Sequence, residues 1–173
     1  MTSVWAYTAL VVVVSLERVA ELVVAARNLR WARQRGAVEA GQRHYPFMVV
    51  LHGGLLLGCI AEVRALDRPF YLWLAVPMLA LLAGSQALRW WCIRSLGPQW
   101  NTRVIVVPGL PLVSSGPYRW LRHPNYVAVV TEGLALPLVH TAWLTALVFT
   151  VLNAGLLARR IRCENQTLAA VSG

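Results

Sequence analysis

The feature of this sequence that most restricts its fold is the alternation of long apolar runs with short clusters of arginine. Of its 173 residues, 58% are apolar and 13% are charged, which is too apolar for an ordinary soluble domain. A bilayer crossing needs about 20 predominantly apolar residues in a helix. Several runs approach or exceed that length, so the sequence predicts an all-α, polytopic integral membrane protein.

The apolar runs divide into five predicted helices within a single domain, residues 1–173. The first run has no basic residue before it and no small-residue cleavage pattern after it, so we expect a retained helix and no signal peptide. The last run, residues 126–158, contains Pro137 near its middle, so we expect two helices that form a hairpin. The predicted transmembrane helices cover approximately residues 4–26, 45–62, 70–92, 125–139 and 141–158.

The charge pattern predicts the orientation in the membrane. Arginine supplies all 16 basic residues, and the seven acids leave a net charge of +9. With five crossings, the arginine clusters within residues 27–43, 119–122 and 159–162 share one side, and the sparse turn 64–68 lies opposite. The positive-inside rule makes the clustered side cytoplasmic, with the amino terminus outside the inner membrane. Such clusters attract anionic lipids, and their separation by apolar runs argues against a nucleic-acid groove.

The cysteines and histidines give no sign of a metal site. Cys59, Cys92 and Cys163 are isolated from one another, and the four histidines show no ligand spacing with them. We therefore predict neither a structural metal nor a disulfide framework.

Residues 96–123 differ in character from the rest of the chain. This stretch contains repeated glycine and proline together with aromatic and basic residues, and it lacks helical periodicity. Long ordered loops on a rigid scaffold are common places for functional sites. We therefore expect a cytoplasmic cofactor-binding loop here.

Two motifs flank the last apolar run. Residues 115–126 read Ser-Gly-Pro-Tyr-Arg-Trp-Leu-Arg-His-Pro-Asn-Tyr, and residues 160–168 read Arg-Ile-Arg-Cys-Glu-Asn-Gln-Thr-Leu. Together they resemble the isoprenylcysteine carboxyl methyltransferase family, and more distantly the phospholipid N-methyltransferases. Residues 17–22 and 41–46 look like a bacterial branch often associated with polyketide-type lipid acceptors. The resemblance implies a membrane enzyme that transfers a methyl group from S-adenosylmethionine.

The same resemblance implies which residues form the site. Glu164 can accept two hydrogen bonds from the cofactor, and Asn125 is an expected N-cap of the following helix. Arg160 lies one helical turn before Glu164, and the resemblance implies that it acts catalytically on an acidic oxygen of the acceptor. The implied cofactor contacts are Pro111, Leu112, Val113, Tyr118, His123, Pro124, Asn125, Tyr126 and Glu164.

Some of these residues also have plainer interpretations. Taken singly, His123 is an interfacial residue before a proline, and Glu164 is a solvated acid in a basic tail. Their occurrence in matched motifs is what indicates a site. Two departures from the family pattern stand out, because Asn165 replaces a usual second glutamate and Arg103 lies where a neutral polar contact is expected.

The implied acceptor is a lipophilic molecule that has an acidic oxygen and enters from the bilayer. It is an alkylpyrone, an alkylresorcinol or an isoprenylcysteine carboxylate. Positioning dominates catalysis of methyl transfer, but a phenol or enol must also lose a proton, and the sequence identifies no base. A phospholipid N-methyltransferase is one alternative, although Arg160 would repel an amine. A non-catalytic membrane carrier or assembly protein is another, because intramembrane charges alone permit it.

Several polar residues fall inside the predicted membrane helices. Uncompensated charge is costly there, so we expect Glu17, Arg18 and Glu21 to form internal pairs that lock helix packing, with a contribution to the acceptor cavity second. We expect interhelical hydrogen bonds from His52 and Glu132. The eight tryptophans are expected mostly to anchor the chain at the membrane interfaces.

Overall fold

The computed structural model describes residues 2–42 and 45–172. Arg43 and His44 lie outside the described residues. Arg43 belongs to the arginine cluster within residues 27–43, and both belong to residues 41–46, which resemble the bacterial branch of the family. Helices dominate the described residues and are joined by a small sheet and short 3₁₀ helices. The elements in chain order are α1 (Thr2–Arg33), β1 (Val38–Ala40), α2 (Tyr45–Ala65), α3 (Leu72–Leu96), η2 (Gly97–Gln99), β2 (Val104–Val106), η3 (Gly116–Arg119), α4 (Pro124–Leu138) and α5 (Trp143–Ser172).

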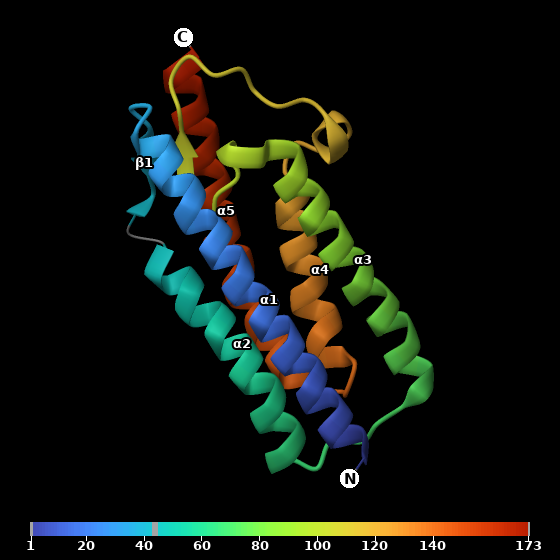
Figure 1. Cartoon of the computed structure of the whole chain (residues 1–173). Helices are drawn as coiled ribbons and strands as arrows, with labels where there is room; N and C mark the ends of the chain where they lie inside the picture. The colour runs from blue at the N-terminus through green and yellow to red at the C-terminus, as the bar shows by residue number, and fades with distance from the viewer. Residues whose placement is uncertain (1, 43–44, 173) are drawn as a thin grey trace.

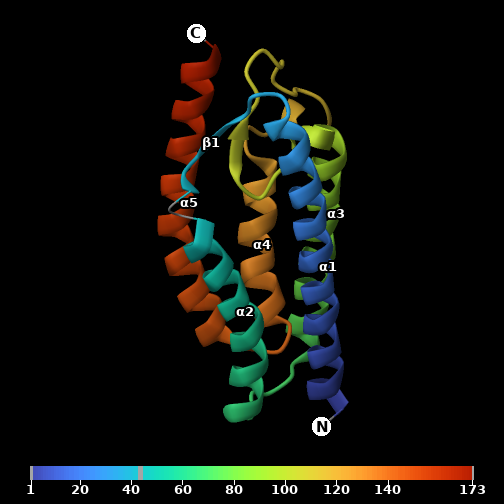
Figure 2. The same ribbon diagram turned by 60° about the vertical axis from the view of Figure 1, so that its left-hand side comes forward.

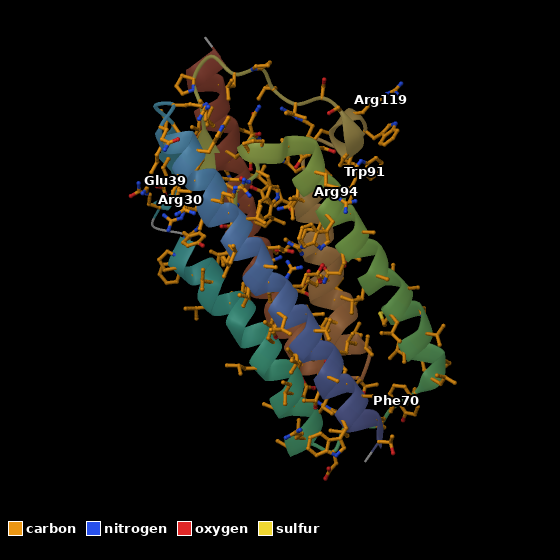
Figure 3. The ribbon with its side chains drawn as sticks, viewed as in Figure 1. Arg30, Glu39, Phe70, Trp91, Arg94 and Arg119 are labelled. Carbon is orange, nitrogen blue, oxygen red and sulfur yellow. The ribbon has the colours of Figure 1, made fainter. Side chains whose placement is uncertain are left out.

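The five long helices run along a common direction, and the two chain ends lie at opposite ends of the bundle (Figures 1 and 2). The end that carries β1, β2 and residues 97–123 is called the loop end, and the end with residues 66–71 and 139–142 is called the turn end. Figure 3 shows Arg30, Arg94 and Arg119 at the loop end and Phe70 at the turn end. This separation of arginines agrees with the expected placement of the clusters on one side of a membrane.

Among the described residues, three helices are long and apolar enough to cross a membrane: Tyr45–Ala65, Leu72–Gln99 and Trp143–Thr167. Helix α4 has only 15 residues, or about 22 Å of helix, which is shorter than a hydrocarbon core of about 30 Å. The nearly all-α, polytopic membrane architecture is thus confirmed. The count of five crossings remains a prediction.

The bundle exposes large apolar side chains along its outside, as a lipid-facing surface requires. Val50, Leu57 and Trp73 are each more than 70% exposed, whereas Val11 and Leu136 are buried between the helices. Neighbouring helices approach closely where a small residue permits it. At Gly133 on α4, an added Cβ would lie 2.1 Å from the Phe149 ring on α5, so this contact requires glycine.

Three features of the backbone differ from the sequence-based expectations. Helices α1 and α5 continue to Arg33 and Ser172, well beyond the apolar runs, because backbone hydrogen bonding continues where hydropathy falls. Strands β1 and β2 pair antiparallel with Val38 opposite Val106, a sheet that the sequence analysis did not anticipate. The expectation that Asn125 caps α4 is wrong, because Pro124 takes the first helical position and His123 the cap position.

Charged residues from α1, α3 and α4 form a buried group, called here the four-charge cluster: Arg18, Glu21, Arg89 and Glu132. Arg18 donates to Glu21 at 2.8 Å, and Arg89 contacts both Glu21 and Glu132. The four side chains are between 3% and 14% exposed. The expected internal pairing of Arg18 and Glu21 and the expected interhelical bond of Glu132 are confirmed.

Two further polar residues within the helices, Glu17 and His52, were also expected to have partners. Glu17 pairs across helices, because it accepts a hydrogen bond from the Trp90 indole at 2.5 Å. The expected interhelical hydrogen bond of His52 is wrong. Its Nδ1 lies 2.8 Å from the Met48 carbonyl, one turn earlier on the same helix α2.

Candidate active site

The two motifs singled out in the sequence meet at the loop end of α4 and α5. The Tyr126 hydroxyl in the first turns of α4 donates a hydrogen bond to the Glu164 carboxylate on α5. The His123 ring stacks on the Tyr126 ring with centroids 5.3 Å apart, and its Nδ1 lies 3.6 Å from Glu164. The helical hairpin therefore brings together side chains about forty residues apart in sequence.

Arg160 joins this group to three other parts of the molecule. Its Nε donates to the Tyr126 hydroxyl at 3.0 Å, and its terminal nitrogens contact the Met48 sulfur on α2 and the Thr102 carbonyl in the loop. A guanidinium carries five N–H donors, and these contacts use three. The other two N–H groups have no partner among the described residues and are available to a ligand.

Arg160 and Tyr126 also line a cavity of about 360 Å³ between α1, α2, α4, α5 and the sheet. Apolar side chains such as Val19, Leu22 and Leu56 form much of its middle. Polar groups stand at its two ends. Arg160, Tyr126 and Thr102 line the loop end, and members of the four-charge cluster line the deep end.

The small sheet forms the rim of this cavity. Arg103 beside β2 donates to Glu39 of β1 at 2.6 Å, and its guanidinium lies 4.4 Å from the centre of the Tyr45 ring. The hydrogen bond that Arg103 donates to Glu39, together with the negative charge of Glu39, raises the pKa of Arg103. The charge of Arg103, unexpected from the family pattern, is thus neutralised by an acid that the sheet brings to it.

Tyr126 and Arg160 lie between the largely apolar cavity and a separate polar group. On one side is the cavity just described. On the other are His123 and Glu164, which do not line the cavity and whose side chains are 20% and 30% exposed. Burial, and after it nearby Cys92 and Glu164, raise the pKa of the Tyr118 hydroxyl. Because Glu164 is one of these neighbours, Tyr118 lies on the same side as Glu164. A ligand bound at Glu164 and a ligand in the cavity would meet at the Tyr126–Arg160 wall.

The remaining predicted contacts are distributed unevenly. Asn125 faces the cavity, and Pro124 is buried at the start of α4. Residues 111–113 lie in the extended segment before η3, and Leu112 is 66% exposed. Within the described part of the chain, no hydrogen bond or ion pair joins them to Glu164. The structure therefore does not bring residues 111–113 into direct polar contact with the acid.

The loop that carries η3 is anchored to the end of α3. Gly116 has φ +60°, and an added Cβ would lie 2.1 Å from the Ser95 hydroxyl oxygen. The Trp120 ring packs edge-on against Trp91 with centroids 5.7 Å apart. This contact fixes the approach of the chain to His123 and so to the site.

The site also includes residues that sequence reasoning did not select. Met48, Thr102 and Glu39 contact Arg160 or the cavity rim. None lies in a distinctive local motif, since each reaches the site only through the packing of α2 and the sheet against α5. The resemblance of residues 41–46 to a family branch was the single signal near them.

Comparison with known proteins agrees with this geometry. The model of the Isoprenylcysteine carboxyl methyltransferase (ICMT) family matches residues 78–170, more than half of the chain. The chain belongs to the isoprenylcysteine carboxyl methyltransferase family. Membership in this family identifies it as a membrane methyltransferase. The matched region contains α4 and nearly all of α5, with Tyr126, Arg160 and Glu164.

Relatives of this family member extend beyond the matched region. Uncharacterized protein YpbQ of Bacillus subtilis is 40% identical over 164 residues, which cover 94% of this chain and 96% of that protein. An uncharacterized protein of Haemophilus influenzae is 25% identical over 149 residues, 86% of each chain. No solved structure matches. The similarity to the Bacillus protein thus includes α1, α2 and the sheet as well as the family region.

Proposed function

We propose that this protein transfers a methyl group from S-adenosylmethionine to an acidic oxygen of a lipophilic acceptor. The observation that carries the proposal is the position of Tyr126 and Arg160, which lie between the partly exposed Glu164 carboxylate and a largely apolar cavity. When bound, S-adenosylmethionine supplies a methyl group on a positively charged sulfur that leaves as a neutral thioether. The chain itself needs only to hold the two reactants in line, which is the main catalytic term in such a transfer.

The residues around Glu164 suit S-adenosylmethionine. The ammonium and ribose hydroxyls of that cofactor donate hydrogen bonds, and the partly exposed Glu164 carboxylate accepts them. The Asn125 side-chain oxygen, on the cavity side of Tyr126, is buried with no hydrogen-bond partner among the described residues, so it can accept a hydrogen bond where the cofactor would meet the cavity. We infer that His123, Tyr118 and Pro124 complete the polar and ring contacts, and that residues 111–113 cover the cofactor from the loop.

The cavity suits an acceptor with an apolar tail and one acidic oxygen. The two unused N–H groups of Arg160 would hold the oxygen as its negative charge meets the methyl group, and the apolar lining would take the tail. Alkylpyrones, alkylresorcinols and isoprenylcysteine carboxylates share this chemistry. An amine acceptor, as in phospholipid N-methylation, is disfavoured because a guanidinium repels a developing ammonium.

We further propose that the protein lies in the inner membrane of the cell, with its loop end facing the cytoplasm. The arginine clusters at that end support this orientation and favour contact with anionic lipids. The cofactor would then be drawn from the cytoplasm and the acceptor from the bilayer.

Titration calorimetry with S-adenosylmethionine on protein in lipid nanodiscs tests the cofactor, and mass spectrometry of lipids from a deletion strain tests the acceptor. We expect binding to wild type, and accumulation in the deletion strain of a lipid lighter by one methylene unit. Absence of cofactor binding would favour the non-catalytic carrier or assembly protein.

A matched pair of variants tests the role of Arg160. Arg160→Lys keeps the charge but loses the fork of N–H donors, so turnover should fall at least tenfold. Arg162→Lys, on an exposed position two residues along the same helix, should leave turnover unchanged. Equal turnover in the two variants would contradict the assignment.

A further inference from the structure

The cavity contains one group with the chemistry of a base and no assigned task, and this inference rests on the proposed function. His52 on α2 lines the cavity and is partly buried. Met48, one turn earlier, connects it to the site: the Met48 sulfur contacts Arg160, and the Met48 carbonyl contacts His52. Side chains of a helix lean toward its amino terminus, and Figure 1 shows the amino terminus of α2 at the loop end. Arg160 contacts Thr102 in the loop at that end.

The contact with Met48 fixes which ring nitrogen of His52 is free. A carbonyl oxygen only accepts hydrogen bonds, so Nδ1, 2.8 Å away, must carry the hydrogen. In the neutral ring Nε2 then has an unshared electron pair. No hydrogen bond to Nε2 occurs within residues 2–42 and 45–172. The Phe149 ring packs edge-on against the imidazole and holds its plane.

The carboxylates that line the cavity and the Tyr126 hydroxyl are already engaged. Glu39 is paired with Arg103 and Arg33, and Glu21 is paired with Arg18 and Arg89. The Tyr126 hydroxyl donates its hydrogen to Glu164. His52 is therefore the described cavity group best able to take up a proton without breaking an ion pair.

We propose that Nε2 of His52 is the general base that removes the proton from a phenol or enol acceptor held at Arg160. The O–H bond of the acceptor breaks, its electron pair stays on oxygen, and the proton bonds to the free pair of Nε2. The resulting imidazolium keeps its Nδ1 hydrogen on the Met48 carbonyl and later releases the added proton to water. The acceptor is thereby of the hydroxyl class, since a carboxylic acid is already ionised at neutral pH and needs no base.

The experiment compares two acceptors with the same alkyl tail, a 5-alkylresorcinol and a 4-alkylbenzoate, using full-length protein in nanodiscs. General base catalysis contributes about 10²–10⁴-fold, so His52→Gln should lower the ratio of resorcinol to benzoate turnover at least 100-fold. His140→Gln is the matched control, because His140 is buried against Tyr7 and Phe70 outside the cavity lining. The control should keep the wild-type ratio.

A second readout does not depend on turnover. An alkyl-tailed nitrophenol absorbs visible light only when ionised, so its titration in the cavity can be followed without any methyl donor. His52→Gln should raise the midpoint of that titration by about one pH unit relative to wild type. The substitution leaves in place the other charged groups around the His52 ring, both those that line the cavity and their ion-pair partners. The difference between the two titration midpoints therefore reports His52 alone. Those groups are Arg18, Glu21, Arg89, Glu132 and Arg160.

The outcomes separate this inference from the proposed function. Equal losses on both acceptors, or an unchanged nitrophenol midpoint, would overturn the role of His52 as a base. Wild-type methylation of the benzoate alone would also overturn it, while the methyltransferase proposal would stand. Failure of wild type to bind S-adenosylmethionine would overturn the proposed function itself.

Discussion

Two groups of arginine side chains in this molecule, one buried and one partly buried, differ in how their charges are matched. In the four-charge cluster, Arg18 and Arg89 face Glu21 and Glu132, so two positive side chains meet two negative ones inside the bundle. Arg160 instead contacts a hydroxyl, a thioether and a carbonyl, none of which carries charge. Among the residues that the structure describes, the first group is electrically balanced, whereas Arg160 has no charged partner and two N–H donors without an acceptor.

This difference indicates two different roles. A balanced group within a membrane bundle fixes helix positions at modest electrostatic cost, because each charge has its partner. Arg160 is partly buried and has no charged partner among the described residues, so binding of an anion would offset the cost of its desolvation. The contrast between the four-charge cluster and Arg160 therefore distinguishes the charges that hold the fold from the one available to a ligand.

The largest expected effect comes from removing one acid of the four-charge cluster. Glu132→Ala would leave Arg89 and Arg18 without a shared partner inside the bundle. Breaking a buried pair typically costs about 3–5 kcal/mol, so thermal unfolding in detergent should shift strongly downward. Replacing both partners in the double variant Arg89→Met/Glu132→Leu should recover much of that loss. A single variant as stable as wild type would show that the cluster does not hold the fold.

The next effect tests the anchor of the loop that leads to the site. Gly109→Ala places a side chain at φ +77° with nothing within 4 Å, so only backbone strain of about 1–2 kcal/mol applies. Gly116→Ala adds overlap with Ser95 at the end of α3, which should cost about 1–3 kcal/mol more. Unfolding midpoints of the two variants isolate the contact with Ser95. The anchor would be unsupported if Gly116→Ala were no worse than Gly109→Ala.

A third prediction concerns the ligand side of the comparison. Glu164→Gln keeps the shape of the side chain but removes its charge, and hydrogen bonds to charged groups contribute about 1.5–3 kcal/mol. We expect affinity for S-adenosylmethionine to fall about 10- to 100-fold in calorimetry, with little change in unfolding temperature. Asn165→Ala, at the exposed neighbouring position, is the matched control and should bind normally. A large loss of stability in Glu164→Gln would instead assign Glu164 to the fold.

The parts of the molecule that local sequence determines were predictable. Apolar runs predicted the positions of the long helices, Pro137 marked the break between α4 and α5, and the flanking motifs predicted the meeting of His123 and Glu164. Hydropathy could not predict where α1 and α5 end, because charged residues at the membrane surface continue a helix as readily as apolar ones do.

Features that depend on packing were not predictable from local sequence. Three-residue strands such as β1 and β2 are too short to give a clear alternation of apolar and polar residues, and they form only because α1 and α5 bring them together. The same holds for Met48, which reaches Arg160 across the bundle. The expected interhelical bond of His52 failed because a carbonyl one turn away on α2 satisfies its Nδ1 first.

The smallest expected effect lies at the cavity rim, where the pair of Glu39 and Arg103 is intermediate between the two groups compared above. Arg103 is 33% exposed, so the pair should contribute less than about 1 kcal/mol to stability. Glu39 raises the pKa of Arg103, but an arginine stays protonated even when no acid lies beside it. Glu39→Gln therefore leaves an unneutralised cation at the rim across the assay pH range. The KM for a benzoate acceptor should therefore fall about two- to fivefold at low ionic strength. That gain should disappear by about 1 M salt, where the screening length is about 3 Å. Glu39→Asp keeps the negative charge and should retain the wild-type KM. A KM that rises in Glu39→Gln would mean that Glu39 orders the rim for binding and does not act by offsetting the charge of Arg103.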